Sequence, residues 1–176
     1  MIEYSSACFS KGKPDWGTPT KLYQQLDEEF NFTLDPCTSK DNPLGTGLFY
    51  TKETDGLIRS WSGSVYVNPP YGSEISQWLE KGLQELKHCE YIVYLLPART
   101  DTRWYHQYVY NSFSKIWWSW VKEVRFLRGR QKMIDMDNPD KKPNTAPFPS
   151  MIVVYQNHIT YRILGSPKKY KIPVDH

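Results

Sequence analysis

The chain has 176 residues, which is enough for one ordinary domain and too few for two well-cored ones. Its 22 Lys and Arg residues against 19 Asp and Glu residues give a formal net charge of +3, a mild excess that permits a polyanionic partner without demanding one. No secretory signal, membrane span, disulfide framework or Cys-x-x-Cys zinc pair is recognisable, so we expect a cytoplasmic protein with no membrane partner and no metal.

The first third of the chain predicts an arm, a helix and two short strands. Residues 1–15 are polar and predict a flexible arm. Thr18-Pro19 predicts an N-cap followed by a proline at the first helical position, and apolar residues follow at helical spacing. Residues 32–34 predict a buried strand that stops at Asp35-Pro36, and residues 48–51 predict a second short strand.

A strand, a helix and a second strand follow in close succession. Residues 64–67 are strand-like and run straight into Asn-Pro-Pro-Tyr at positions 68–71. Apolar residues at 75–86 then repeat at helical spacing, and residues 91–96 form an unbroken apolar run, which is typical of a strand buried on both faces. This order predicts a right-handed βαβ unit with parallel strands.

The C-terminal half is less regular. Residues 102–112 predict a short helix, and residues 131–149, rich in Asp, Asn, Pro and Lys, predict a long loop. We expect a single domain over residues 16–165 and a tail at 166–176. Further strands are predicted over residues 116–120, 124–127 and 151–155.

The Asn-Pro-Pro-Tyr turn indicates methylation of an amino group on a planar, conjugated system. Such an amine is a poor nucleophile because its lone pair is delocalised into the ring. The Asn68 side-chain oxygen and the Pro69 carbonyl could accept its two N–H bonds and free that lone pair. Pro70 completes a stiff turn that holds the carbonyl in place, and Tyr71 offers a flat face on which an extruded base could stack.

Two acidic residues are candidates for binding the cofactor S-adenosylmethionine. Asp35 ends the first predicted strand, and ligands of open α/β sheets bind beyond the carboxyl ends of the strands. Asp55 lies 20 positions further on, near the spacing at which an acidic residue often meets a nucleotide ribose. Either residue could instead serve an Asx turn or a helix cap.

With these residues in view, the chain resembles the compact phage and prophage DNA N6-adenine methyltransferases, the Dam-type phage family. The resemblance implies methyl transfer from S-adenosylmethionine to adenine N6 in double-stranded DNA, in the host cytoplasm if a phage encodes the protein. It also adds Thr18, Pro19 and Pro36 to the cofactor-binding set. It rests on ordered blocks at residues 16–19, 32–37, 55–57, 67–72, 95–102, 125–130 and 146–151.

The sequence departs from larger methyltransferases in two respects. Cys37-Thr38-Ser39-Lys40 stands where a glycine-rich turn usually follows the first strand. Because a parallel crossover needs a dozen or more residues, the interval from Asp35 to Asn68 leaves room for one short strand at most. We therefore expect an abbreviated Rossmann-like α/β sheet, mostly parallel, with helices on both faces.

Basic and aromatic residues of the C-terminal half are candidates for DNA contacts. Lys and Arg would bind phosphates in a salt-dependent way, and Trp104 could stack or wedge during base extrusion. The basic stretch could equally be a solvated strand face. The candidate DNA-binding residues are Arg99, Arg103, Trp104, Arg125, Arg128, Arg130 and Lys132.

Other functions remain open at this point. The same tetrapeptide could grip an adenine of RNA or a glutamine of a protein, and the chain could also be a DNA-binding relative that has lost the reaction. We expect a monomer or a weak dimer.

Overall fold

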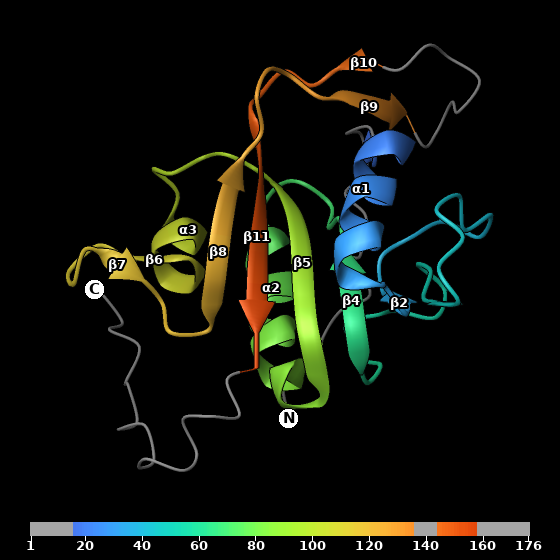
Figure 1. Ribbon diagram of the computed structural model, residues 1–176, viewed down its shortest axis with the longest axis horizontal. Helices are drawn as coiled ribbons and strands as arrows, with labels where there is room; N and C mark the ends of the chain where they lie inside the picture. Colours follow the sequence, from blue (N-terminus) through green and yellow to red (C-terminus); the bar gives the residue numbers. More distant parts are fainter. Residues whose placement is uncertain (1–15, 136–143, 158–176) are drawn as a thin grey trace.

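The computed structural model describes residues 16–135 and 144–157 (Figure 1). The predicted arm and tail lie outside the described residues. The elements are β1 (Trp16–Gly17), α1 (Thr20–Phe30), β2 (Leu34–Asp35), β3 (Leu48–Phe49), β4 (Gly63–Val67), α2 (Ile75–Glu85), a 3₁₀ turn (Leu86–His88), β5 (Cys89–Pro97), α3 (Arg103–Tyr108), β6 (Tyr110–Asn111), β7 (Ile116–Trp117), β8 (Val121–Phe126), β9 (Lys132–Asp135), β10 (Asn144–Thr145) and β11 (Ser150–Gln156).

Six strands form the main sheet, in the order β3-β2-β4-β5-β11-β8. The first four are parallel, and β11 is antiparallel to both of its neighbours. The sheet is therefore mixed, although β11 alone among its strands runs against the others, so the mostly parallel sheet that the sequence predicted is found in part. Because β11 is antiparallel to both β5 and β8, β5 and β8 run in the same direction. Their carboxyl ends lie on either side of Met151, which pairs with Leu96 of β5 and with Phe126 of β8.

The carboxyl ends of β2, β4, β5 and β8 consequently lie at one edge of the sheet. Only one short strand, β3, lies between β2 and β4 in the chain, as the spacing predicted. The expected βαβ unit is also present, because β4 pairs in parallel with β5 and α2 connects them.

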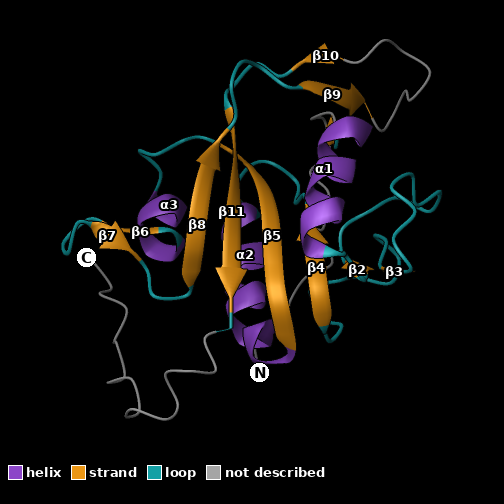
Figure 2. Cartoon of the chain, viewed as in Figure 1, coloured by secondary structure: helices purple, strands orange, loops and turns teal. Residues whose placement is uncertain are grey.

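Helices cover both faces of the sheet (Figure 2), as the sequence predicted. The alternation of side chains along β4 shows how the layers divide. Tyr66 packs with the apolar face of α1, while Val65 and Val67 pack with α2 and α3 on the other side. All three side chains are fully buried, so the centre of the sheet is covered on both faces.

The segment predicted as a long loop at 131–149 contains two short strands. β9 pairs antiparallel with β1 and with β10, forming a small second sheet beside the N-terminal end of α1 (Figure 1). The loop prediction was wrong because β9 forms by pairing with β1, which is distant in the chain, and the residues around β9 do not show a strand pattern. Residues 136–143 of that segment lie outside the described residues.

The predicted helix at 102–112 is shorter than expected. It ends at Tyr108, because Tyr110 and Asn111 pair with Trp117 and Ile116 in a two-stranded hairpin. The predicted strand at 116–120 is thus the second arm of this hairpin, and the following main-sheet strand begins earlier than expected, at Val121.

The start of α1 also differs from the prediction. The residue flanking the helix is Pro19, with φ −59° and ψ 124°, and no side chain caps the helix. Thr18 does not cap it because its hydroxyl is engaged elsewhere, as described below. Within the described residues, no helix is long and apolar enough to cross a membrane.

Candidate active site

A pocket of about 330 Å³ opens at the carboxyl edge of the main sheet. It is within the usual range of ligand pockets, about 300–1,000 Å³. Its walls bring together five candidate residues from three separate parts of the chain: Thr18, Asp35, and the consecutive Asn68, Pro69 and Pro70. Parallel strands cause this convergence, because β2 and β4 deliver Asp35 and Asn68 to the same edge.

The Asn68 side chain is held in one orientation by the segment before α1. Its Nδ2 donates to the backbone carbonyl of Trp16 at 2.6 Å and to Thr18 Oγ1 at 3.1 Å. Because a carbonyl can only accept, the amide nitrogen must face Trp16, and the Oδ1 atom is directed elsewhere. This oxygen is buried and has no hydrogen-bond partner within the described residues.

Asp35 is the buried acidic group of the pocket. Only 2% of the residue is exposed, and its Oδ1 accepts the backbone N–H of Cys37 at 3.0 Å. Burial raises the pKa of the carboxyl to about 7, and the hydrogen bond from Cys37 opposes part of that rise. A cation entering the pocket would therefore meet a carboxyl group that it can ionise at neutral pH.

Sequence reasoning missed two further walls of the pocket. Residues 37–40 replace the absent glycine-rich turn and line the pocket directly after β2. Residues 51–53 line it after β3, and Glu53 there pairs with Lys40 at 3.1 Å. Hydrogen bonds, first that from Thr51, hold the pKa of Glu53 at about 2. Glu53 could have been identified from the sequence because it follows a predicted strand, and that strand, β3, runs parallel to β2.

The proline turn after β4 is rigid and buried, while Tyr71 sits behind it. Pro69 and Pro70 are buried and line the pocket. Tyr71 is half-buried and is not among the lining residues; its ring meets Phe148 edge-on at 5.3 Å, and its hydroxyl donates to the Leu95 carbonyl at 3.4 Å. Phe148 is a neighbour that the sequence did not identify.

Three predicted cofactor-binding residues do not line the pocket. Asp55 makes an Asx turn, accepting the Leu57 N–H at 3.0 Å with φ +49°, which was the alternative reading of its sequence. Pro36 packs under Gly56, where an added Cβ would lie 2.0 Å from the Pro36 carbonyl oxygen. Pro19 only flanks α1. These residues therefore shape the loops around the pocket.

Five of the predicted DNA-binding residues are exposed around the same edge. Arg99 follows β5, and its guanidinium lies 5.9 Å from the Phe148 ring centre. Arg130 follows β8, and its Nη1 donates to the Ala146 carbonyl at 3.5 Å. The exposed set is Arg99, Arg103, Arg128, Arg130 and Lys132.

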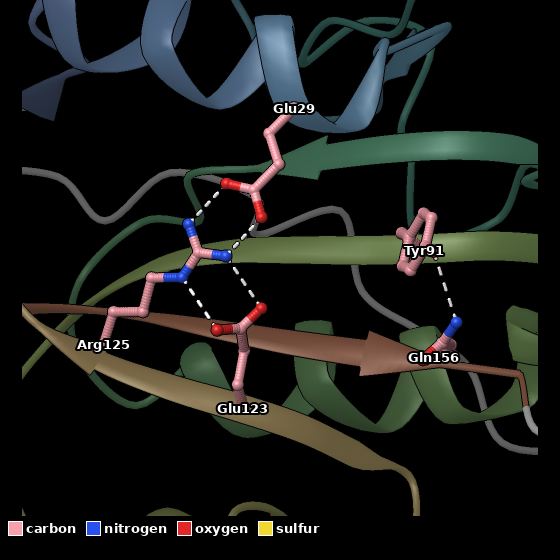
Figure 3. Close-up of polar contacts among 5 residues, drawn as sticks. All are labelled: Glu29, Tyr91, Glu123, Arg125 and Gln156. Atoms are coloured by element: carbon pink, nitrogen blue, oxygen red, sulfur yellow. Dashed lines mark hydrogen bonds and ion pairs between the residues drawn. The ribbon is translucent and has the colours of Figure 1, made fainter.

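Arg125 was expected to contact DNA, but its charge is used inside the protein. Figure 3 shows the guanidinium between two carboxylates, Glu29 of α1 and Glu123 of β8. Nη1 donates to Glu29 at 2.6 Å, and Nε donates to Glu123 at 2.9 Å. With both carboxylates in contact, Arg125 ties α1 to the sheet and has little positive charge left for a phosphate.

Trp104 is likewise not available as a surface wedge. Only 7% of the residue is exposed, and it belongs to the core between α2, α3 and the sheet. Its ring meets that of Tyr105 edge-on at 6.1 Å. The helix that carries Trp104 is amphipathic, and the sequence did not reveal which side faces the sheet. Within the described residues, no group of three or more His, Cys, Asp or Glu side chains could hold a metal ion.

Comparison with known proteins gives consistent matches. The sequence matches the family described as DNA N-6-adenine-methyltransferase (Dam) over residues 6–171. A DNA N-6-adenine-methyltransferase of Escherichia phage T1 is 31% identical over 105 residues, which cover 58% of this chain and 43% of the phage protein. The match thus spans less than half the length of that relative.

A solved structure supports the fold assignment. A crystal structure of a Pyrococcus horikoshii protein, named as a candidate RNA methyltransferase, superposes with a TM-score of 0.53 at 12% identity. The superposition covers 88% of this chain and 94% of the other. At so low an identity the likeness concerns the fold alone.

Proposed function

Because the chain belongs to the DNA N-6-adenine-methyltransferase (Dam) family, we propose that it transfers a methyl group from S-adenosylmethionine to the N6 amino group of adenine in DNA. The Asn-Pro-Pro-Tyr turn at residues 68–71 is the proposed catalytic centre. The phage relative is more than twice as long as the part that matches this chain. The proposal is therefore argued from this chain's own pocket and not from the activity of that relative.

The unpartnered Oδ1 atom of Asn68 is the observation that carries this proposal. A buried acceptor without a donor costs about 1–3 kcal/mol, so its retention in a pocket favours a ligand that supplies the donor. The amino group of an extruded adenine has two N–H bonds. One can be donated to Asn68 Oδ1 and the other to the Pro69 carbonyl, which draws the nitrogen lone pair out of conjugation.

The buried position of this oxygen sets a condition on substrate entry. Because water does not reach the atom, the base must displace the groups that cover it as it leaves the duplex. We propose that the Tyr71 ring, which Phe148 contacts edge-on, stacks on the base once the base has entered behind the proline turn. No general base is required, since the proton can leave after the amine becomes cationic.

The residues present fit S-adenosylmethionine, which supplies an electrophilic methyl group when bound. Asp35 is a buried carboxyl that attracts a cationic ligand, and burial, partly opposed by the hydrogen bond from Cys37, raises its pKa to about 7. Glu53 and the hydroxyls of residues 38, 39 and 51, which also line the pocket, could provide further polar contacts. The loop at 37–40, which follows β2, would contact the ligand in place of the missing glycine-rich turn.

On the DNA side, we propose that exposed arginines around the pocket edge bind phosphates. The Arg99 guanidinium lies over the ring of Phe148, which in turn contacts the ring of Tyr71. Arg128, Arg130 and Lys132 extend the basic surface along the connection to β9. The resulting affinity should fall steeply with salt concentration. For a phage-encoded enzyme, this action would take place in the host cytoplasm.

The test is transfer of a labelled methyl group from S-adenosylmethionine to unmethylated double-stranded DNA, followed by mapping of the modified base. We expect N6-methyladenine in a defined sequence context. Asn68→Ala should abolish transfer while the circular dichroism spectrum and the midpoint of urea unfolding show that the protein still folds. Asn157→Ala, a matched asparagine substitution far from the pocket, should retain activity.

Other acceptors separate this proposal from its alternatives. Label in RNA or in a protein glutamine but not in DNA would redirect the proposed substrate. Absence of transfer to any acceptor, with S-adenosylmethionine failing to bind in calorimetry, would favour a silent DNA-binding relative. Full activity of Asn68→Ala would contradict the proposed mechanism.

A further inference from the structure

Two polar side chains, one in β4 and one directly after it, lie on one face and share a partner outside the sheet. Because side chains alternate along a strand, Tyr66 and Asn68 point to the same side, the one that α1 covers. Thr18 precedes α1 and lies over both of them. Its Oγ1 is 2.8 Å from the Tyr66 hydroxyl and accepts the Asn68 Nδ2 at 3.1 Å.

This arrangement uses both hydrogens of the Asn68 amide. One is donated to Thr18 Oγ1 and the other to the Trp16 carbonyl, which is 2.6 Å away. Turning the amide over would place Oδ1 against that carbonyl oxygen, with no hydrogen between two acceptors. The contacts on the nitrogen side therefore decide where the oxygen points.

The support behind Thr18 is rigid. Tyr66 is fully buried, its ring meets that of Tyr23 edge-on at 5.1 Å, and 4% of Thr18 is exposed. Trp16 belongs to β1, which β9 holds in an antiparallel pair. Neither contact on the amide nitrogen can swing away without disturbing the packing beneath α1.

We propose that Thr18 is a positioning residue, which orients the Asn68 amide so that Oδ1 is presented to the target amine. The kinetic part of this proposal rests on the proposed function. Thr18 also lines the pocket, so the competing assignment is a direct contact with the cofactor, as the family resemblance implies. The two assignments predict different effects of removing the hydroxyl.

Four variants separate the two assignments. Thr18→Val removes the hydroxyl at nearly constant size, Thr18→Ser keeps it, and Tyr66→Phe removes only the oxygen behind it. Thr20→Val is the matched control, since Thr20 is exposed at the first turn of α1. We expect Thr18→Val to lower kcat at least tenfold with less than a twofold change in the Kd of S-adenosylmethionine. Thr18→Ser should stay within threefold of wild-type kcat.

The kcat and the Kd of S-adenosylmethionine in these variants distinguish the two assignments. A raised Kd for S-adenosylmethionine with unchanged kcat in Thr18→Val would overturn the proposal in favour of a cofactor contact. Equal losses in Thr18→Val and Thr18→Ser would overturn it in favour of a purely steric role. If Thr18→Val does not fold, Tyr66→Phe decides: a several-fold loss of kcat at unchanged Kd supports the proposal, and no loss contradicts it.

A measurement without turnover tests the same contact even if methyl transfer fails. In ¹⁵N-labelled protein, the side-chain amide signals of Asn68 are those missing from the spectrum of Asn68→Ala. We expect these protons to exchange slowly with water in the wild type and at least fivefold faster in Thr18→Val, with recovery in Thr18→Ser. Unchanged exchange in Thr18→Val would overturn the orienting role, whereas an inactive wild type with the expected exchange would contradict only the proposed function.

Discussion

Replacing Asp35 with asparagine should make the protein more stable above neutral pH while weakening its pocket for a cation. The carboxyl is fully buried, and its pKa is raised from 3.8 to about 7. Between these values the folded state retains a proton that the unfolded state has lost. The free energy of unfolding of the wild type therefore falls as pH rises from about 4 to about 7, and remains lowered above that range.

The magnitude follows from the size of the shift. A rise from 3.8 to about 7 corresponds to a loss of up to roughly 4 kcal/mol, at about 1.4 kcal/mol per pH unit within the window. Asparagine carries no titrating group and can still accept the Cys37 N–H through its Oδ1. The stability gained by Asp35→Asn should thus grow with pH up to about 7 and then level off.

Urea unfolding of the wild type and Asp35→Asn at pH 5, 6, 7 and 8 measures this difference. Asp41→Asn, at an exposed position in the neighbouring loop, controls for the loss of an acidic residue. A difference between wild type and Asp35→Asn that does not change from pH 5 to pH 7 would refute the reasoning. So would a wild type that gains stability over that interval relative to the variant.

The same carboxyl group should make cofactor binding depend on pH. A cationic ligand favours the ionised form of Asp35, so the affinity of the wild type for S-adenosylmethionine should rise about tenfold per unit below pH 7 and level off above it. Asp35→Asn should bind more weakly and with a flatter profile in calorimetry. An equally steep profile in the variant would assign the pH dependence to another group.

Two further predictions test the packing and the electrostatics of the fold. Gly82→Ala should lower the free energy of unfolding by about 1–3 kcal/mol in urea titrations, because its Cβ would lie 1.7 Å from the Tyr94 hydroxyl oxygen; Gly47→Ala, with open space around it, should cost much less. Arg128→Met should reduce the slope of log DNA affinity against log salt concentration by about one. Arg125→Met should leave that slope unchanged and lower the free energy of unfolding instead, because the Arg125 guanidinium already contacts Glu29 and Glu123. Equal effects of the two arginine substitutions on DNA binding would show that Arg125 is available to phosphates after all.

The basic residues show where sequence reasoning reached its limit. Arg125 and Arg128 lie three positions apart and look equivalent in the sequence. In the folded protein Arg125 meets a carboxylate from α1, 96 positions away, while Arg128 is exposed. Only long-range packing separates a structural ion pair from a free surface charge.

The acidic residues give a similar lesson. Asp35 was identified by its position after a predicted strand, and the structure places it in the pocket. Asp55 was chosen by spacing along the chain, but the loop after β3 brings Glu53 to the pocket instead and leaves Asp55 in an Asx turn. Strand ends are predictable from local pattern, whereas the path of a loop depends on what it packs against.

The sequence by itself determined the parts of this protein that depend on local chemistry. Continuous apolar runs predicted the buried strands, helical spacing predicted α1 and α2, and the Asn-Pro-Pro-Tyr turn is the basis of the chemistry proposed for residues 68–71. Tertiary structure alone decided that β11 inserts antiparallel between β5 and β8, that β1 pairs with β9, and that Thr18 and Trp16 hold the Asn68 amide. These features join residues up to 119 positions apart, as in the pairing of Trp16 with Asp135, and no pattern of neighbouring residues encodes such a contact.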